Sequence, residues 1–469
     1  MMQKLFDEVG SLDKRCYEDF ALSEDILMEH AAEGMAAFIR SKFALGSTVL
    51  VVCGNGNNGA DGLALSRLLH KEYKVNIFIV KEAKKEMAIL QDRRAHAIHV
   101  KRTLYLNDCD VIVDAIFGTG FDGSLDVEAK SVMQTLNSLS AYKIACDIPS
   151  GMRINGECDR DTFVADTTLT MGALKKSLFN DQAKGFVGEV KVLDLGVNRE
   201  VYESESNWNL LEFKDMKLPT REIQNTHKGS FGHLCVTAGE KMGASIISSL
   251  SALNFGSGLV TLLSEDKDPS CKIPYEIMLS PKIPKNATAL AFGMGLGISF
   301  ELERLKEHLD NTLPLIVDAD LFSMPIITEI LKRDSLVITP HPKEFVSLLK
   351  LTGLAEITVD ELQNRRFFYS ELFCEKYPHV VLLLKGANVI IAHERNYFIN
   401  TQGTAALAKG GSGDVLSGLI GSLLAQGYEP LSAAITASLA HTKLAQNYSG
   451  SDFSLTPADL IKEIAKLSL

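Results

Sequence analysis

The stretch that decides the fold is Thr48–Gly62, which reads TVLVVCGNGNNGADG. Its first six residues are apolar or β-branched, a composition typical of a strand buried on both faces. The glycine-rich turn that follows leads into a helical spacing of leucines between Leu63 and Leu69. A strand, a glycine-rich turn and a helix in this order predict the first crossover unit of a parallel α/β sheet.

The strand signature recurs at spacings that leave room for a crossover helix. In the first half of the chain it recurs at Val75–Val80, Val111–Val113 and Lys143–Cys146. A polar segment, Arg199–Gln224, then precedes a second series, made of His233–Thr237, Ala289–Phe292, Leu315–Val317, Leu336–Thr339, Val380–Leu384 and Val389–Ile391. This alternation predicts two doubly wound α/β domains with mainly parallel sheets. We place them at residues 1–213 and 214–469.

Length, composition and charge exclude several classes of protein. A chain of 469 residues is too long for one ordinary domain, and its 46% hydrophobic and 23% charged residues are typical of a globular protein. The net charge of −11 argues against a nucleic-acid partner, which would require a basic surface. The uncharged stretch Met242–Ser264 contains six serines and is interrupted by Gly256-Ser257-Gly258, so we expect a helix and a strand there and no membrane span.

The cysteines and the N-terminus predict the compartment. None of the eight cysteines shows CxxC spacing, and Cys53, Cys146 and Cys235 lie within strand-like runs, where reduced cysteine packs as a small apolar residue. The first residues are charged before any apolar run, so we expect no signal peptide. These features predict a cytoplasmic protein without a membrane partner.

The first glycine-rich loop matches GxGxxG through Gly54, Gly56 and Gly59, and Glu82 ends the next predicted strand. On these residues alone a dehydrogenase fingerprint is one interpretation. The loop also carries polar side chains that the fingerprint does not require, namely Asn57, Asn58 and Asp61. Its backbone N–H groups would hold phosphate, while the amide and carboxylate oxygens would hold a cation or ribose. A strand-to-helix turn without a ligand is the alternative.

Two further segments follow strands that should end at the same sheet edge. Asp114–Gly123 reads DAIFGTGFDG, and Asp147–Gly151 reads DIPSG. Ligands bind beyond the carboxyl ends of parallel strands, so the side chains of the three loops should converge. The converging residues would be Asn58, Asp114, Asp147 and Ser150. For Asp147, a helix or turn cap is the alternative role.

The motifs GNGNNGxDG, DxxFGTG and DIPSG together resemble the NAD(P)H-hydrate epimerase domain of YjeF type, over roughly residues 1–210. The resemblance implies a Rossmann-like α/β/α fold and the interconversion of the R and S forms of hydrated NADH and NADPH (NADHX and NADPHX). It implies substrate binding by Asn57, Asn58, Gly59, Ala60, Asp61, Gly118, Thr119, Gly120, Phe121, Asp122, Gly123, Ser124 and Asp147. It also implies a potassium ion on Asn58, Asp114 and Ser150.

The proposed chemistry suits these residue types. Inverting the hydrated C6 carbon requires the hydroxyl to leave and return, or the ring to open and close, and one carboxylate that moves a proton assists either path. The resemblance assigns this catalytic role to Asp147. The sequence departs from the family at Ala60, where glycine is common, and a negative φ there would accommodate the extra methyl group.

The second glycine-rich loop is Gly410–Asp414, which reads GGSGD and precedes an apolar helical pattern. Consecutive free N–H groups at the start of that helix would form an anion hole for a transferring phosphoryl group. Asp414 lies in the first turn, where it would accept a proton from a substrate hydroxyl. An acidic residue that only stabilises the start of the helix is the alternative.

GGSGD resembles the anion-hole motif of ribokinase-like kinases. With Thr226–Gly229, Gly256–Thr261, Gly293–Gly297, Asp318–Asp320, Thr339–Glu344 and Lys385–Ile390, it resembles ADP-dependent NAD(P)H-hydrate dehydratase across nearly all of residues 220–469. The resemblance implies a ribokinase-like α/β fold in which the hydrate contacts Gly258, Gly295, His341 and Asp414. It implies a nucleotide site made of Lys385, Gly386, Ala387, Asn388, Val389, Gly410, Gly411, Ser412 and Gly413.

The resemblance further implies Mg²⁺ on the phosphates of ADP and Asp414 as the catalytic base. Two positions depart from the family, Lys343 from a common glycine and Asn388 from a common threonine, and neither removes a proposed catalytic group. From the residues alone, His341 is equally a capping or packing residue.

These motifs predict a bifunctional repair enzyme that epimerises NADHX and NADPHX and dehydrates the S form at the expense of ADP, giving AMP and phosphate. Small molecules are the expected partners, and the resemblance implies a homo-oligomer. Two other functions stay open at this point. One is a ribokinase-like vitamin or sugar kinase with an accessory nucleotide-binding domain, and the other is a non-catalytic scaffold that binds RNA or protein.

Overall fold

The computed structural model describes residues 2–121, 123–265, 271–297, 300 and 302–468. The chain forms two compact units, Gln3–Trp208 and Asn209–Leu469, the second of which includes the first two residues. Each unit is an α/β domain built on a largely parallel sheet, which confirms the predicted fold class. The division falls between Trp208 and Asn209, whereas the sequence placed it between residues 213 and 214.

The N-terminal unit contains a seven-stranded sheet in which every pairing is parallel. In sheet order its strands are β4 (Lys101–Arg102), β3 (Lys74–Ile79), β2 (Thr48–Cys53), β5 (Val111–Ala115), β6 (Tyr142–Cys146), β7 (Thr167–Met171) and β9 (Glu189–Leu193). Strand order reverses between β2 and β5, which pair in register at Val49↔Val111. Ligands bind at such a switch point in open α/β sheets.

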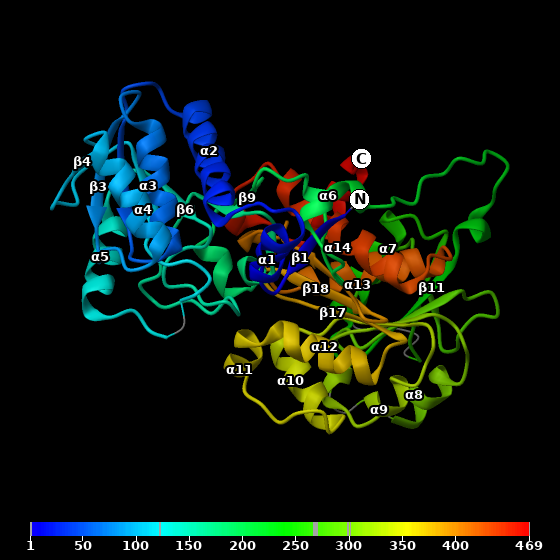
Figure 1. Cartoon of the computed structure of the whole chain (residues 1–469). Helices are drawn as coiled ribbons and strands as arrows, with labels where there is room; N and C mark the ends of the chain where they lie inside the picture. Colours follow the sequence, from blue (N-terminus) through cyan, green and yellow to red (C-terminus); the bar gives the residue numbers. More distant parts are fainter. Residues whose placement is uncertain (1, 122, 266–270, 298–299, 301, 469) are drawn as a thin grey trace. The chain divides into compact units, whose positions relative to one another are not determined.

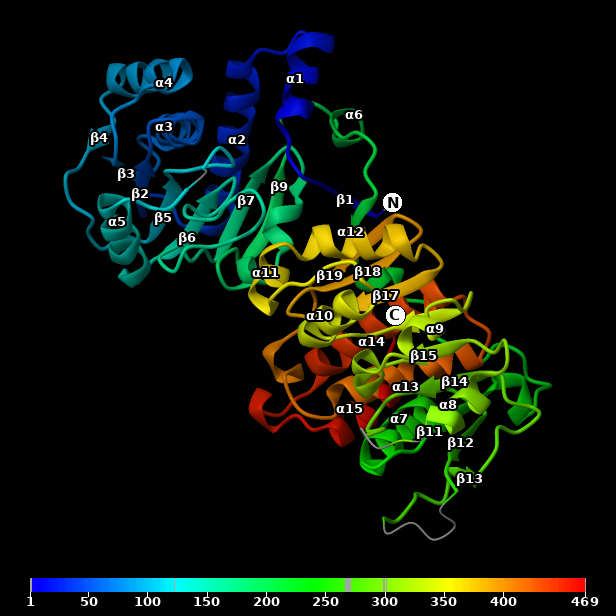
Figure 2. The ribbon, with the colours of Figure 1, turned by 90° about the horizontal axis from the view of Figure 1, so that it is seen from below.

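Helices cover both faces of this sheet (Figure 2). One face carries α2 (Glu24–Lys42) and α3 (Asn57–Leu69), and the other carries α5 (Val127–Ser138). Alternate residues of β2 therefore enter separate cores, with Val49 and Val51 on one side and Leu50 and Val52 on the other. The remaining elements are α1 (Gly10–Asp19), α4 (Glu86–Ala97), α6 (Arg199–Tyr202), η1 (Lys176–Phe179), η2 (Gln182–Gly185) and the parallel pair β1 (Gln3–Phe6) and β8 (Leu174–Lys175).

The sequence did not predict β7, because three of its five residues are threonine. All three threonines are fully buried. Each has a polar partner, since the hydroxyl of Thr168 donates to the carbonyl of Val187 at 2.7 Å and that of Thr167 bonds the hydroxyl of Tyr142 at 2.6 Å. The third, Thr170, receives a hydrogen bond from Lys175. Hydrogen-bonded threonines can occupy a core strand that hydropathy alone would reject.

The C-terminal unit contains a second sheet with helices on both of its faces (Figure 1). In sheet order its strands are β13 (Met278–Ser280), β12 (Leu259–Leu263), β11 (His233–Thr237), β14 (Ala289–Phe292), β15 (Leu315–Val317), β16 (Leu336–Ile338), β17 (Val380–Leu384), β18 (Val389–His393) and β19 (Asn396–Asn400). The strands from β13 to β17 pair in parallel, and β17, β18 and β19 pair antiparallel. Strand β10 (Trp208–Leu210) spans the division between the units.

The C-terminal helices are α7 (Met242–Asn254), α8 (Leu302–Leu309), α9 (Ile327–Ile330), α10 (Pro342–Leu351), α11 (Val359–Asn364), α12 (Arg366–Lys376), α13 (Ser412–Ala425), α14 (Pro430–Asn447) and α15 (Pro457–Glu463). Short 3₁₀ helices are η3 (Phe213–Asp215), η4 (Lys228–Phe231), η5 (Ala319–Ser323), η6 (Ala405–Leu407), η7 (Asp452–Ser454) and η8 (Ile464–Lys466). Helices α7, α13 and α14 share one core.

The serine-rich stretch forms helix α7 and strand β12, as the sequence predicted. Its serines attach α7 to the start of α13, since the hydroxyl of Ser248 donates to the carbonyl of Asp414 and that of Ser251 to the carbonyl of Val415, both at 2.8 Å. Within the described residues, no helix combines the length and the apolar character that crossing a bilayer requires. The contact with α7 fixes the backbone that carries Asp414.

Candidate functional sites

The glycine-rich loop after β2 depends on two close backbone approaches. A Cβ atom on Gly54 would lie 2.0 Å from the carbonyl oxygen of Ile116, and one on Gly59 would lie 2.1 Å from the carbonyl oxygen of Gly54. Gly56 has no neighbour that a Cβ would meet and caps the start of α3. The glycines therefore let the loop fold tightly against the end of β5, directly before the first turn of α3.

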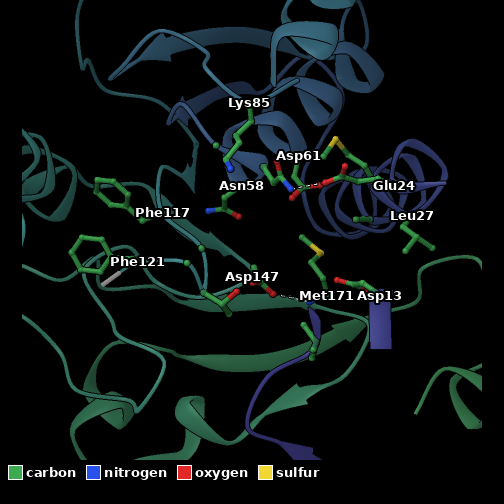
Figure 3. A pocket seen from close by; sticks show the side chains of 18 of the residues that line it. Asp13, Glu24, Leu27, Asn58, Asp61, Lys85, Phe117, Phe121, Asp147 and Met171 are labelled. Carbon is green, nitrogen blue, oxygen red and sulfur yellow. Dashed lines mark hydrogen bonds between the residues drawn. The ribbon is translucent and has the colours of Figure 1, made fainter. Parts of the chain in front are cut away.

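A cavity of about 600 Å³ opens at this loop (Figure 3). Of the residues that the sequence assigned to the substrate, Asn57, Asn58, Asp61, Gly118, Thr119, Gly120, Phe121 and Asp147 line it. Gly59 and Ala60 are buried in α3 behind the lining, and Gly123 and Ser124 are exposed outside it. Asp122 lies outside the described residues. The three predicted loops thus meet at one cavity.

The structure accommodates alanine at position 60, where the family commonly has glycine. Ala60 lies within α3, is fully buried, and does not have a positive φ. Its methyl group packs in a small core with Met28, Met87 and Ala88. The methyl group therefore replaces the family's glycine without backbone strain.

Asp114 and Ser150 are hydrogen-bonded to each other behind the cavity, whereas Asn58 is part of the cavity lining. The loop after β5 lies beside both, since the N–H of Phe117 donates to the Ser150 hydroxyl and a Cβ atom on Gly118 would lie 3.4 Å from the Cβ of Asn58. Asp114 is fully buried and accepts hydrogen bonds from the Ser150 hydroxyl at 2.6 Å and the Ser150 backbone N–H at 2.7 Å. Burial raises the pKa of Asp114 to about 6, although these hydrogen bonds oppose the rise. Asn58 is 8% exposed, and among the described residues neither the oxygen nor the nitrogen of its amide has a hydrogen-bond partner.

These three side chains fit a monovalent cation. An unpartnered buried amide oxygen and a buried carboxylate both cost free energy that a coordinated cation would offset. The donors are oxygens, which hard cations prefer, and Asp114 supplies a single negative charge. Among the described residues, no group of three or more His, Cys, Asp or Glu side chains is placed to hold a metal ion.

Asp147 follows β6 in a constrained backbone position. Its φ of +70° lies in the left-handed region, which non-glycine residues seldom occupy and which is often found at functional sites. Its Oδ1 accepts hydrogen bonds from the Lys175 ammonium at 2.5 Å and from the backbone N–H of Met171 at 3.1 Å. Its side chain is 13% exposed and lines the cavity. Oδ1 is thus held by the protein, in a residue that lines the cavity.

Three further carboxylates line the same cavity, namely Asp13, Glu24 and Asp61. Burial raises the pKa of Asp61 well above its usual range, and the charges of Asp147, Asp13 and Glu24 raise it further. Burial also raises the pKa of Asp13, although a hydrogen bond from the hydroxyl of Tyr202 at 2.7 Å opposes the rise. Four carboxylates, counting Asp147, therefore share one cavity, and burial with their mutual repulsion favours the protonated form of Asp61.

In the C-terminal unit, three of the predicted residues lie at the carboxyl ends of parallel strands. Gly295 follows β14, His341 follows β16, and Lys385 follows β17. The glycine-rich loop leads into α13 through Gly411, whose φ is +88°. A Cβ atom on Gly413 would lie 3.3 Å from the Lys385 ammonium nitrogen, so the ammonium lies beside the start of α13. The residues Gly386, Ala387 and Asn388 lie in the turn between β17 and β18, and Val389 begins β18.

Asp318 is a buried carboxylate that contacts both Lys385 and helix α13. It is 3% exposed, accepts a hydrogen bond from the Ser417 hydroxyl at 2.7 Å, and pairs with the Lys385 ammonium at 2.6 Å. Burial raises the pKa of Asp414 to about 6, and the charge of Asp318 raises it further, while that of Lys385 lowers it. Asp414 is therefore a stronger base than an exposed aspartate.

His341 caps helix α10. Its Nδ1 accepts hydrogen bonds from the backbone N–H groups of Lys343 at 3.1 Å and Glu344 at 3.3 Å, which leaves the proton of the neutral ring on Nε2. Burial lowers the pKa of His341, and the charge of Lys385 lowers it further. Burial raises the pKa of Glu344 to about 7. His341 is thus a cap whose ring remains about half exposed, so capping and ligand contact are compatible.

Gly258 and Gly295 have structural reasons to be glycine. A Cβ atom on Gly258 would lie 1.7 Å from the carbonyl oxygen of Lys228. Gly295 has a φ of +65°, and its Cβ would lie 2.4 Å from the carbonyl oxygen of Lys241. Both glycines therefore permit close backbone packing, but at opposite edges of the sheet, because Gly258 precedes β12 and Gly295 follows β14 in a parallel arrangement. The structure thus does not bring Gly258 together with the predicted residues at the carboxyl ends of the strands.

Two buried basic side chains contact predicted site residues but were not predicted from the sequence. Lys175 is 1% exposed and reaches Asp147. His441 on α14 is 8% exposed, and its Nε2 lies 3.1 Å from the hydroxyl of Ser412 in the second glycine-rich loop. Burial lowers the pKa of His441 to about 4. The sequence signal that could have indicated each residue was a basic side chain within an apolar or uncharged run. This signal is not specific, because helices and strands often carry a basic residue at their ends.

Both units therefore place a glycine-rich loop and an aspartate at the carboxyl edge of a parallel sheet. This arrangement is typical of α/β enzymes that bind nucleotides. Residues 234–466 match the family model described as NAD(P)H-hydrate dehydratase, and residues 24–177 match the YjeF-related protein N-terminus. The chain belongs to the family of bifunctional NAD(P)H-hydrate repair enzymes, which confirms the resemblance seen in the motifs.

Relatives match along the whole chain. The bifunctional NAD(P)H-hydrate repair enzyme Nnr of Helicobacter pylori is 43% identical, with 99% of this chain and 100% of that protein covered. The enzyme of the same name from Dictyoglomus turgidum is 30% identical, with 97% and 96% covered. Among solved structures, an ADP/ATP-dependent NAD(P)H-hydrate dehydratase from Bacillus subtilis, co-crystallised with ATP and Mg²⁺, is 27% identical, covers 53% of this chain and 92% of its own, and has a TM-score of 0.46.

Proposed function

We propose that this chain repairs hydrated NADH and NADPH in two steps. The N-terminal unit interconverts the R and S epimers, and the C-terminal unit dehydrates the S epimer at the expense of ADP. The observation that carries the proposal is Asp147, which is held at Oδ1 by Lys175 and lines the cavity formed by the two glycine-containing loops. Family membership supports it for both units.

In the epimerase site, the carboxylate of Asp147 accepts a proton from the C6 hydroxyl as the ring opens and returns one as it closes on the other face. Lys175 and the N–H of Met171 fix the carboxylate, so that Oδ2 is directed at the ring. The peptide N–H groups at the start of α3 bind the substrate phosphates. No net oxidation occurs, so the site needs no redox group.

Potassium would be held by Asn58, Asp114 and Ser150. The bound ion would supply a fixed positive charge behind the glycine-rich loop. The unpartnered amide of Asn58 and the buried carboxylate of Asp114 support this assignment. Without a cation, the amide of Asn58 would keep no polar partner among the described residues, and the buried charge of Asp114 would be offset by hydrogen bonds alone.

In the dehydratase site, Asp414 accepts the proton of the C6 hydroxyl as that oxygen attacks the terminal phosphorus of ADP, and AMP leaves. The C6–O bond of the resulting phosphate ester then breaks, driven by the lone pair of the ring nitrogen, and inorganic phosphate leaves. Loss of a C5 proton restores the dihydropyridine. Lys385 and the N–H groups of Gly411–Gly413 stabilise the transferring phosphoryl group. Mg²⁺ on the phosphates of ADP would neutralise their charge.

An absorbance assay at the NADH band tests both activities in one sample. An equal mixture of the epimers is incubated with ADP, Mg²⁺ and K⁺, and inorganic phosphate is measured in parallel. Complete recovery of the band with one phosphate per NADH is expected. Recovery of only the S share would show that the N-terminal unit does not epimerise, and a stable phosphate ester would indicate a kinase.

Two predictions about the protein's context belong with this proposal. A homo-oligomer is expected, which size-exclusion chromatography with light scattering would detect.

The free thiols of all eight cysteines suit the reducing cytoplasm, where the nicotinamide cofactors are abundant. Fractionation of cells followed by immunodetection tests the compartment.

A further inference from the structure

The charges around the N-terminal cavity are unequally distributed. Its described lining carries four carboxylates, those of Asp13, Glu24, Asp61 and Asp147, and one cationic side chain, Lys85. A hydrated NAD(P)H carries a negatively charged diphosphate, and NADPHX carries a 2′-phosphate in addition. Both groups would be repelled by a lining of this sign, so their binding requires a local positive charge.

Lys85 is placed to supply that charge. It precedes α4 at the helix N-cap position, and its backbone N–H, with that of Lys84, donates to the carbonyl oxygen of Asn55 at 3.3 and 3.1 Å. The backbone of Lys85 is therefore tied to the first glycine-rich loop. Among the described residues, its ammonium group makes no hydrogen bond or ion pair.

Figure 3 shows the Lys85 side chain pointing into the cavity toward Asn58, with Asp147 on the opposite side of Asn58. The start of α3 lies close to the backbone of Lys85, because the N–H of Lys85 donates to the carbonyl oxygen of Asn55, two residues before the helix begins at Asn57. A phosphate bound at Lys85 would therefore also face the helix N-terminus. The reacting ring would then extend toward Asp147.

We propose that Lys85 binds a phosphate group of the hydrated nucleotide in the epimerase site and so orients the ring toward Asp147. This inference rests on the proposed function and deepens it. The lysine determines which end of the substrate enters the acidic side of the cavity. A charge-assisted hydrogen bond at a partly exposed site contributes about 1.5 kcal/mol, which corresponds to about a tenfold change in affinity.

The kinetic test compares Lys85→Gln with Lys84→Gln in the full chain. Lys84 is an exposed neighbour that does not line the cavity, so it controls for net charge. We expect the KM for epimerisation to rise about tenfold in Lys85→Gln with kcat unchanged, and the KM of Lys84→Gln to stay within about twofold of wild type. An equal rise for NADHX and NADPHX identifies the diphosphate as the bound group, and a rise for NADPHX alone identifies the 2′-phosphate.

A second readout does not depend on activity. The rate at which acetic anhydride acetylates each lysine is measured by mass spectrometry, with and without NADP⁺, NAD⁺ or nicotinamide riboside. We expect NADP⁺ to protect Lys85 about fivefold or more, Lys84 to change little, and the riboside, which lacks phosphate, to protect neither. Protection without epimerisation would overturn the proposed function but keep the phosphate site. Epimerisation with an unchanged KM in Lys85→Gln, and no protection of Lys85, would overturn the inference alone.

Discussion

The ammonium of Lys175 lies 2.5 Å from Oδ1 of Asp147, and the lysine side chain is 1% exposed. The same ammonium donates to the hydroxyl of Thr170 at 2.8 Å and to the carbonyl of Met171 at 3.3 Å. All its donors are therefore used within the protein, and the lysine does not line the cavity. Lys175 is a positioning residue, because it acts on the substrate only through Asp147.

We predict that Lys175→Met lowers the kcat of epimerisation at least about tenfold with little change in KM, because the substrate still binds while Asp147 loses its fixed orientation. Removing one partner of a buried pair should also cost about 3 kcal/mol of unfolding free energy. Steady-state kinetics and denaturant unfolding measure the two effects. Lys176→Met is the matched control, since Lys176 pairs with Asp7 instead. Equal kcat values in both variants would remove Lys175 from the mechanism.

Asp147→Asn should abolish exchange of the R and S epimers, because the amide cannot accept the proton that the carboxylate accepts. Dehydration of pure S epimer by the C-terminal unit should be unaffected. The exchange is measured by chromatography of the two epimers. If the variant still exchanged them at the wild-type rate, Asp147 would have no catalytic role.

Asn58→Ala should raise the K⁺ concentration for half-maximal epimerisation about tenfold or more, because it removes a neutral oxygen ligand from the proposed ion site. The activity is measured over a titration of KCl against a constant ionic strength of choline chloride. Dehydration of the S epimer serves as the internal control. An identical potassium curve for the variant and the wild type would contradict the proposed ligand set.

Asp414→Asn should lower the dehydration rate by at least about a thousandfold, because the amide cannot accept the proton of the C6 hydroxyl. The same substitution should also stabilise the folded protein. Because the pKa of Asp414 in the folded chain, about 6, lies above its usual value of 3.8, the folding contribution of this group is lost as pH rises through 6. At pH 7 the variant should therefore be about 1–2 kcal/mol more stable, a range reduced for partial exposure. In the wild type, dehydration should fall as pH drops below about 6. Denaturant unfolding measures the difference in unfolding free energy between the variant and the wild type. If this difference were the same at pH 7 and at pH 4, the pKa of Asp414 would not be raised.

His441→Gln should change the response to acid. The pKa of His441 is about 4 in the folded chain and 6.5 in the reference state, so unfolding takes up a proton in this interval. Stability that is fully present above pH 6.5 is therefore lost as pH falls toward 4. Between pH 7 and pH 5 the wild type should lose about 2 kcal/mol more unfolding free energy than the variant. Parallel losses measured by denaturant unfolding would show that His441 is not buried neutral.

The sequence predicted much of the fold because the signals were local. The apolar run Thr48–Cys53 became β2 with the predicted bounds, and Val380–Leu384 became β17. The antiparallel hairpin of β18 and β19 was not predicted as such, and the threonine-rich strand β7 was missed. Hydropathy cannot distinguish a buried hydrogen-bonded threonine from an exposed one, since the partner lies elsewhere in the chain.

Sequence alone determined the two α/β domains, the three loops that meet at the cavity, and the aspartates at their ends, because periodicity and glycine spacing act over a few residues. Only the tertiary structure decided that Lys175 holds Asp147 across 28 positions and that His441 contacts Ser412 across 29. It also decided the raised pKa values of Asp114 and Asp414. These properties arise from burial and from which faces pack together, and such long-range packing leaves no local pattern in the chain.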